Sequence, residues 1–239
     1  MQTKKLHSWN LPYSQAASLQ KHLARKVKFT ALKKNPKLIA GLDCAFTKSG
    51  QTIVAAAIIL KLPGFDLIET KTASRKVTFP YIPGLLSFRE APVCIAAVEK
   101  LENEPDIFII DGQGIAHPRR LGLAAHLGLL FDNPTIGCAK SRLTGLFNDP
   151  PPQKGAYSLL KDKKRATPDP SDRIRNTNLE IIGAVVRTRT NVKPVFVSVG
   201  HKCLLRDAIR ITLRCAIKYR LPEPIRLAHQ LVSELRLQA

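Results

Sequence analysis

The sequence is poor in acidic residues, and none stands before Asp43. Only 18 Asp and Glu accompany 38 Lys and Arg in 239 residues, so the net charge is +20 and the sequence pI is about 10.1. Such an excess predicts a polyanionic partner, and nucleic acid is the first expectation. A membrane surface is the alternative, although the basic stretch lacks the apolar face that an interfacial helix inserts. The basic residues before Asp43 are Lys4, Lys5, Lys21, Arg25, Lys26, Lys28, Lys33, Lys34 and Lys37.

The chain also lacks paired cysteines and long apolar runs. None of its five cysteines forms a Cys-x-x-Cys pair, and most stand in apolar segments, which predicts buried thiols in a reducing compartment. The first residues have no apolar core of a secretion signal, and no run approaches the roughly 18 apolar residues that span a bilayer. We therefore expect a soluble, cytoplasmic protein that does not enter a membrane. The cysteines are Cys44, Cys94, Cys138, Cys203 and Cys215.

No internal repeat is visible, and the composition is otherwise that of a globular protein. Hydrophobic residues make up 44% and charged residues 23%, which supplies enough apolar material for one continuous core. We expect one domain over residues 1–239, in which residues 1–37 form a basic, helix-containing segment that packs on the core or flanks it. We also expect a monomer.

Hydrophobic periodicity predicts strands first and helices interleaved later. Three β-rich runs with short connections predict an antiparallel meander, and a strand–helix–strand succession after them predicts parallel pairing. This order is typical of an α/β, ribonuclease H-like arrangement: a mixed central sheet (three-stranded antiparallel meander plus parallel strands) flanked by helices, with the first strand beside the fourth. The expected strands are 38–46, 52–62, 67–77, 107–110, 135–139, 179–189 and 195–199. The expected helices are 14–23 with Ser14 as N-cap, 87–101 with Pro92 in the first turn, 119–131, 204–220 and 222–235, and residues 161–173 are expected to form a polar loop.

Two aspartates stand in costly positions. Asp43 interrupts an apolar strand and Asp111 ends another, and a buried carboxylate is expensive unless it is paired or binds a metal. If the first and fourth strands are neighbours, the two carboxylates converge, and Glu90 near the beginning of a helix supplies a third. Three converging acids suit Mg²⁺ or Mn²⁺ rather than zinc. Each acid taken alone is equally well explained as a strand-end or helix-cap residue.

The segments around these residues carry a family resemblance. PYIPGLLSFRE (80–90), DGQGIAHPRRLGLAAHLG (111–128), TIGCAKS (135–141) and VFVSVGH (195–201) resemble endonuclease V, the nuclease that acts on strands containing inosine. The resemblance runs from about Leu38 to Leu235, which is nearly the whole chain.

The resemblance implies roles for five catalytic positions. Asp43 and Asp111 match the metal-binding aspartates of the family, and Glu90 matches its glutamate after Ser-Phe-Arg, so Mg²⁺ is the implied cofactor and Mn²⁺ a substitute. Lys140 resembles the lysine beside the scissile phosphate. His229 falls on a position that is His or Asp in the family, although a half-buried structural histidine explains it equally well.

Three further groups of residues are implied for recognition. A rigid loop between two prolines presents an aromatic wedge that parts the strands, although a turn with a core-facing Tyr is the alternative. Glycines let main-chain groups approach the expelled base closely. The wedge is Pro80, Tyr81, Ile82 and Pro83; the base pocket is Leu86, Gly112, Gly114, Leu123 and Leu143; and His117, Arg119 and Arg120 are expected to contact the backbone, although a solvated basic helix start also explains them.

The implied reaction is metal-dependent hydrolysis of DNA at deoxyinosine. By resemblance the cut falls at the second phosphodiester bond 3′ to the lesion, which initiates repair, and the base is not released. One alternative is an endoribonuclease specific for inosine in RNA, because contacts to a 2′-hydroxyl are not readable from the sequence. A non-catalytic nucleic-acid-binding module is the other, and the intact set of three acids speaks against it.

Overall fold

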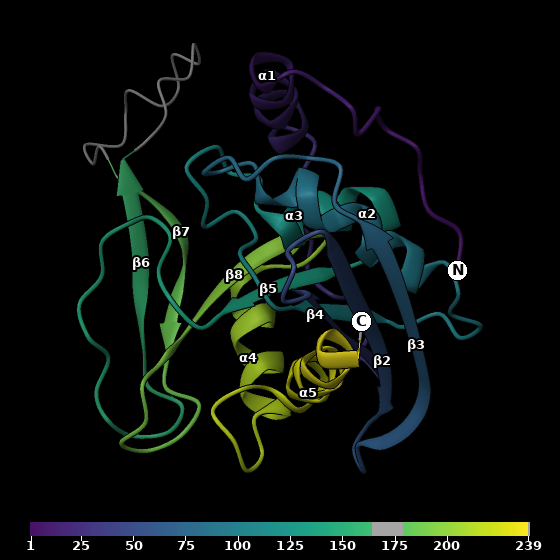
Figure 1. The fold of residues 1–239 in the computed structure, drawn as a ribbon. Helices are drawn as coiled ribbons and strands as arrows, with labels where there is room; N and C mark the ends of the chain where they lie inside the picture. The colour runs from purple at the N-terminus through teal and green to yellow at the C-terminus, as the bar shows by residue number, and fades with distance from the viewer. Residues whose placement is uncertain (164–178, 239) are drawn as a thin grey trace.

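A mixed sheet of eight strands organises the molecule. The computed structural model describes residues 1–163 and 179–238, and the strands follow the order β3-β2-β1-β4-β5-β8-β7-β6 (Figure 1). The strands are β1 (Leu38–Phe46), β2 (Thr52–Lys61), β3 (Asp66–Lys76), β4 (Ile107–Ile110), β5 (Thr135–Ala139), β6 (Tyr157–Lys163), β7 (Leu179–Val186) and β8 (Val195–His201).

The strand pairing confirms the expected topology. Strands β1, β2 and β3 form the antiparallel meander, while β4 pairs in parallel with β1 on one side and with β5 on the other. The central strands β4 and β5 are apolar and buried throughout, as strands covered on both faces are. Strand β1 is therefore central and lies beside β4, which is the ribonuclease H-like arrangement.

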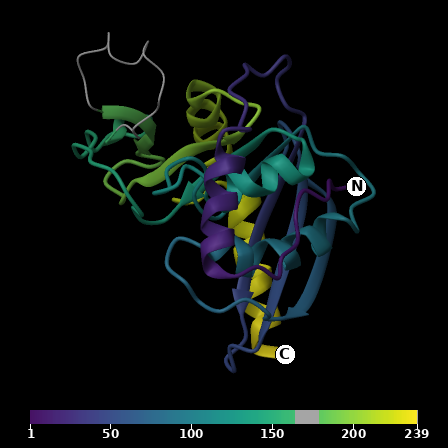
Figure 2. The ribbon, with the colours of Figure 1, turned by 90° about the horizontal axis from the view of Figure 1, so that it is seen from above.

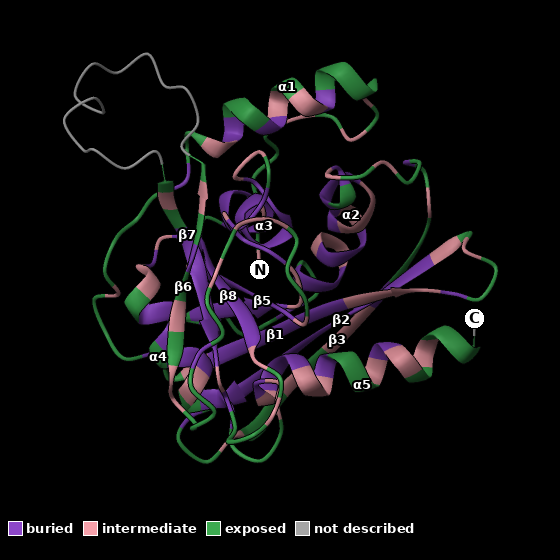
Figure 3. Ribbon diagram, turned by 90° about the vertical axis from the view of Figure 1, so that its left-hand side faces the viewer, coloured by how far each residue is buried: buried purple, intermediate pink, exposed green. Residues whose placement is uncertain are grey.

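Helices cover both faces of this sheet. Helices α2 (Leu86–Val98) and α3 (Leu123–Phe131) pack on one face, and α4 (Leu205–Cys215) and α5 (Glu223–Gln238) pack on the other (Figures 1 and 3). Alternate residues of the strands feed the two cores: Leu42 and Phe108 point to the α2–α3 side, and Ile39 and Ile109 to the α4 side. The two layers hold the carboxyl ends of β1, β4 and β5 in fixed positions.

The N-terminal segment lies outside these layers. Helix α1 (Tyr13–Ala24) packs through Leu19 and Leu23 on Leu121 and Ala125 at the α3 side, and Figure 2 shows it lying across the molecule. The chain before α1 continues over α2 and α3. A helix thus lies within residues 1–37, and its apolar side chains contact the α3 side of the core.

Several element boundaries differ from the sequence predictions. Helix α1 begins at Tyr13 after Pro12 and has no side-chain cap, so Ser14 is not the N-cap. Pro92 lies inside α2 rather than in its first turn. Helix α3 begins only at Leu123, because the backbone of Arg120 is left-handed with φ of 58° and breaks the expected helix there.

Two differences concern the C-terminal half. Helix α4 ends at Cys215, because the chain turns at Ala216 and carries Arg220 back to the carbonyl oxygens of Lys140 and Pro194. Strand β6 was not expected, and it takes residues 161–163 from the predicted polar loop; residues 164–173 of that loop lie outside the described residues. Throughout 1–163 and 179–238, no helix is long and apolar enough to cross a membrane.

Candidate active site

The sheet brings the two aspartates together at one edge. Asp43 is the sixth residue of β1 and is buried, while Asp111 follows directly after β4. The parallel pairing extends one step beyond β4, because the Asp111 amide donates to the Leu42 carbonyl oxygen at 3.0 Å. The two carboxylates therefore come from adjacent positions of neighbouring strands, as the sequence predicted.

Helix α5 and the end of β5 supply a nitrogen partner for each carboxylate. His229 Nδ1 lies 2.7 Å from Asp43 Oδ2, and Lys140 Nζ lies 2.7 Å from Asp111 Oδ2 and 3.3 Å from His229 Nδ1. The close approach of α5 depends on Gly41 of β1, because a Cβ there would lie 2.0 Å from the Pro224 carbonyl oxygen. A glycine two residues before Asp43 thus positions the helix that carries His229.

Burial and like charge shift the carboxyl groups of this site. Burial, followed by repulsion from Asp111, raises the pKa of Asp43 to about 6 against the opposing effects of His229 and Lys140. Burial raises the pKa of Glu90 to about 8, and the charges of Asp43 and Asp111 add to the rise. Three carboxyl groups therefore lie close enough to repel one another when ionised, and a bound cation would relieve that repulsion.

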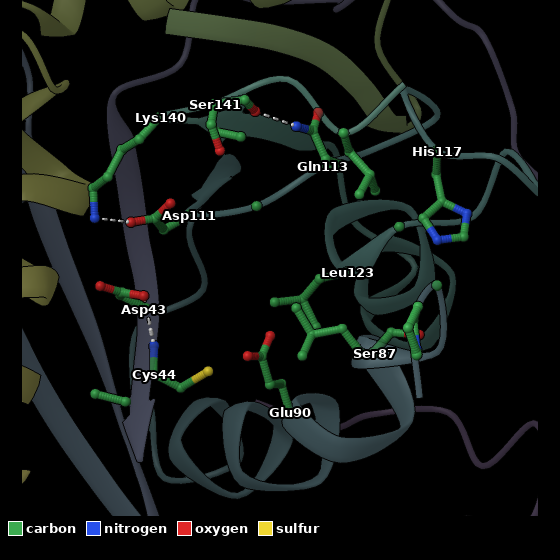
Figure 4. A pocket seen from close by; sticks show the side chains of 18 of the residues that line it. Asp43, Cys44, Ser87, Glu90, Asp111, Gln113, His117, Leu123, Lys140 and Ser141 are labelled. Atoms are coloured by element: carbon green, nitrogen blue, oxygen red, sulfur yellow. Dashed lines mark hydrogen bonds and ion pairs between the residues drawn. The ribbon is translucent and has the colours of Figure 1, made fainter. Parts of the chain in front are cut away.

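The donor set fits a divalent cation. Ligand atoms of Asp43, Asp111 and His229 all lie within 4.8 Å of one another. Two carboxylate oxygens and an imidazole nitrogen suit a hard or borderline ion that keeps open positions for water and substrate. Glu90 is not one of these three; it rises from α2 across the cavity and faces them (Figure 4), and its place in a metal shell stays a prediction.

These groups open into a cavity of about 700 Å³. Most of the recognition residues predicted from the sequence line the same cavity. Tyr81, Leu86 and Leu143 are 68%, 42% and 52% exposed at its border, so three large apolar side chains are accessible to a ligand there. The predicted residues that line it are Asp43, Tyr81, Ile82, Pro83, Leu86, Glu90, Asp111, Gly112, His117, Leu123, Lys140, Leu143 and His229.

Four predicted residues lie elsewhere. Pro80 borders a neighbouring depression, and Gly114 packs under β8, where a Cβ would lie 2.0 Å from the Val199 carbonyl oxygen. Arg119 bonds to Gln20 and, at 2.6 Å, to the Gly84 carbonyl oxygen, so it ties α1 to the wedge loop. Arg120 pairs with Asp162 and Glu180 of the β6–β7 hairpin. Their contacts with nucleic acid stay predictions.

The structure adds cavity residues that the sequence reasoning missed. Gln113 donates from Nε2 to the Ser141 carbonyl oxygen at 3.0 Å and links the segments after β4 and β5. Ser233 and Arg236 extend the His229 face of α5 along the cavity. Their spacing of four and seven residues from His229 is the helical signal that predicts them once His229 is placed.

The chain was compared with known proteins. A model of the Endonuclease V family matches residues 21–230. The chain belongs to the endonuclease V family. Endonuclease V of Methanothrix thermoacetophila is 47% identical over 229 residues, which cover 96% of this chain and 94% of the relative.

Solved structures of the endonuclease V family have the same fold. The crystal structure of Endonuclease V from Streptomyces avermitilis is 36% identical with a TM-score of 0.84, and the match covers 95% of this chain and 94% of that one. Ciona intestinalis Endonuclease V, solved with a 24mer DNA containing an inosine followed by a ribo-adenosine, is 30% identical with a TM-score of 0.73 and coverages of 93% and 96%. The ribonuclease H-like fold and the predicted family are thereby confirmed.

Proposed function

We propose that this protein hydrolyses the second phosphodiester bond 3′ to deoxyinosine in DNA, with Mg²⁺ as cofactor, and so initiates repair of deaminated bases. One observation carries the proposal: the acidic cluster of Asp43 and Asp111 shares its cavity with an exposed aromatic loop and apolar side chains suited to an expelled base. Cleavage and base recognition thus have room in one continuous site.

Mg²⁺ held by Asp43 and Asp111, with Glu90 completing its shell, would supply an activated water and neutralise charge on the reacting phosphate. In the geometry described, the Asp43 carboxylate accepts from His229 Nδ1–H, so His229 Nε2 carries the lone pair. His229 is thereby oriented to take a proton from the attacking water. Lys140 stands beside Asp111 and offsets negative charge on the phosphate.

We assign recognition of the expelled base to the part of the cavity opposite Asp43 and Asp111. Tyr81 is held in a loop that Arg119 fixes at the Gly84 carbonyl, and it occupies the space that the base leaves. The base enters between Leu86, Leu123 and Leu143 beside Gly112, whose φ of 144° is open to glycine rather than to larger residues. We further propose a monomer that acts in the cytoplasm, in keeping with five free cysteines.

The decisive experiment compares matched DNA and RNA strands, each with one inosine and one end label, with Mg²⁺ and with EDTA. We expect Mg²⁺-dependent nicking of the DNA at the second bond 3′ to inosine and slower nicking of the RNA. Faster cleavage of the RNA would make the protein an endoribonuclease. Binding of both strands without any nicking would leave a non-catalytic binding module and overturn the proposal.

A further inference from the structure

Two histidines connect the N-terminal segment to the base side of the cavity. His7 Nδ1 lies 2.8 Å from the Ser8 carbonyl oxygen, His7 Nε2 lies 2.7 Å from His126 Nε2, and His126 Nδ1 lies 3.1 Å from Ser87 Oγ. Ser87 lines the cavity next to Leu86, and Figure 4 shows it on the side of Leu123 and His117, away from Lys140. The chain of contacts thus runs from the surface to the base pocket.

The chemistry of these contacts fixes the direction of each hydrogen bond. A carbonyl oxygen only accepts, so His7 Nδ1 carries the proton and, in the neutral ring, His7 Nε2 is an acceptor. His126 Nε2–H then donates to His7, which leaves His126 Nδ1 as an acceptor. Ser87 must therefore donate its O–H to His126, and only the lone pairs of its oxygen remain for another partner.

The surroundings keep both rings neutral. Burial lowers the pKa of His7, and burial together with repulsion from His7 lowers the pKa of His126 to about 3. His126 is fully buried and packs against Trp9 and Phe88, with ring centroids 5.2 Å and 5.3 Å apart. Neither ring changes protonation at neutral pH, so the direction of the chain is constant.

We propose that Ser87 is a specificity residue, whose oxygen accepts a hydrogen bond from the ring N–H of the expelled base, with His7 and His126 as positioning residues. This inference rests on the proposed function. Deamination of adenine converts N1 from an acceptor into an N1–H donor beside a new carbonyl. An oxygen that only accepts pairs with hypoxanthine and opposes the lone pair of adenine, so it favours bases with such an N–H group over adenine.

The test uses single-stranded DNA, in which no partner strand has to be parted. The probes carry either deoxyinosine or purine deoxyriboside, which has a lone pair at N1 and no N–H. We expect Ser87→Ala to slow nicking at deoxyinosine about tenfold, the effect of one neutral hydrogen bond, and to change nicking at the purine less than twofold. An equal loss on both probes would make Ser87 merely structural and overturn the proposal.

A matched pair of variants at His7 tests the direction of the chain. The side-chain oxygen of His7→Gln accepts from His126 and preserves the direction, whereas His7→Lys only donates and reverses it, so that Ser87 offers its proton to the base. We expect the parent ratio of inosine to purine nicking in His7→Gln and a ratio about tenfold lower in His7→Lys. The melting temperature of each variant checks that it is folded. Equal ratios of inosine to purine nicking in the two folded variants would refute the proposed chain of hydrogen bonds. Absence of nicking by the parent protein would instead refute the proposed function.

Discussion

At the scale of single residues, we expect Asp43 and Asp111 to contribute to hydrolysis and not to binding of the nucleic-acid strand. Replacing Asp43 or Asp111 by Ala should lower Mg²⁺-dependent nicking by more than about 100-fold, since loss of even an outer-shell metal partner costs about 10- to 100-fold. Binding of an inosine strand in Ca²⁺, measured by fluorescence anisotropy, should change less than about threefold. Full nicking in either variant would remove the proposed site.

The shifted carboxyl groups predict how stability depends on pH. Glu90 has a folded-state pKa of about 8, above its ordinary value of 4.5, so the folded protein binds the extra proton between these values. The contribution of Glu90 to stability is therefore fully present below pH 4.5 and is lost as the pH rises through 8. The melting temperature in EDTA should fall from pH 6 to pH 8 in the parent protein.

Glu90→Gln provides the matched control for this titration, because it keeps the shape and removes the ionisation. We expect the melting temperature of this variant to fall less steeply with pH. In the parent protein, Mg²⁺ should make the fall in melting temperature smaller. The Asp43 carboxyl, with its pKa of about 6, adds to the fall in the same direction only at the lower end of this pH range. A slope identical in the two proteins would mean that Glu90 is already ionised at neutral pH.

Substitution of His229 distinguishes a catalytic role of this histidine from a structural one. Its side chain is 47% exposed, so His229→Ala removes little packing, while it takes away the group that bonds to Asp43. We expect turnover to fall by about 10²- to 10⁴-fold, the range of general acid–base catalysis, with the melting temperature shifted by less than about 2 °C. A melting temperature that drops together with the rate would support the structural role.

At the scale of elements, the wedge loop is distinct from the catalytic residues. Tyr81 is 68% exposed between Pro80 and the Ile82–Pro83 step, so Tyr81→Ala should not alter stability or metal dependence. Parting a base pair costs a few kcal/mol, so we expect nicking of inosine in duplex DNA to slow by about tenfold or more while single-stranded DNA is nicked within about twofold of the parent rate. Equal effects on both substrates would make the loop a structural turn.

The elements also show which features sequence reasoning reaches. Strands β1 and β4 were predictable because Asp43 is the only charged residue in their apolar runs. Strand β6 was not, since its last three residues are charged, only Leu160 of the strand is buried, and it is held mainly by its pairing with β7. The early end of α4 depends on Arg220 reaching the Lys140 carbonyl 80 residues away, a contact that local periodicity does not contain.

The same limit applies to the site. The carboxylates were predictable because a charge in an apolar strand is expensive, and the family resemblance placed Lys140 and Tyr81. Ser87 and His126 gave no such signal, because a serine in the first turn of a helix and a single histidine in an apolar helix are usually structural. Only the contact with His7, more than 100 residues away, reveals them.

At the scale of the whole molecule, positive charge exceeds negative charge by 20. Within residues 1–163 and 179–238, only seven Lys and Arg form ion pairs: Lys4, Lys71, Arg120, Lys140, Lys202, Arg210 and Arg226. The exposed cations among the other described Lys and Arg are available to phosphates.

This charge predicts how salt acts on binding. Each phosphate contact with duplex DNA contributes roughly −0.9 to the slope of log affinity against log salt, so about six contacts would lower affinity about 10³-fold between roughly 50 and 200 mM. Contacts to the expelled base are short-range and release no counterions. Undamaged and inosine-containing duplexes, titrated in EDTA, should therefore give two parallel lines displaced by a constant factor. A flat line would assign the charge to another partner, and a steeper line for inosine would mean that the lesion recruits additional phosphates.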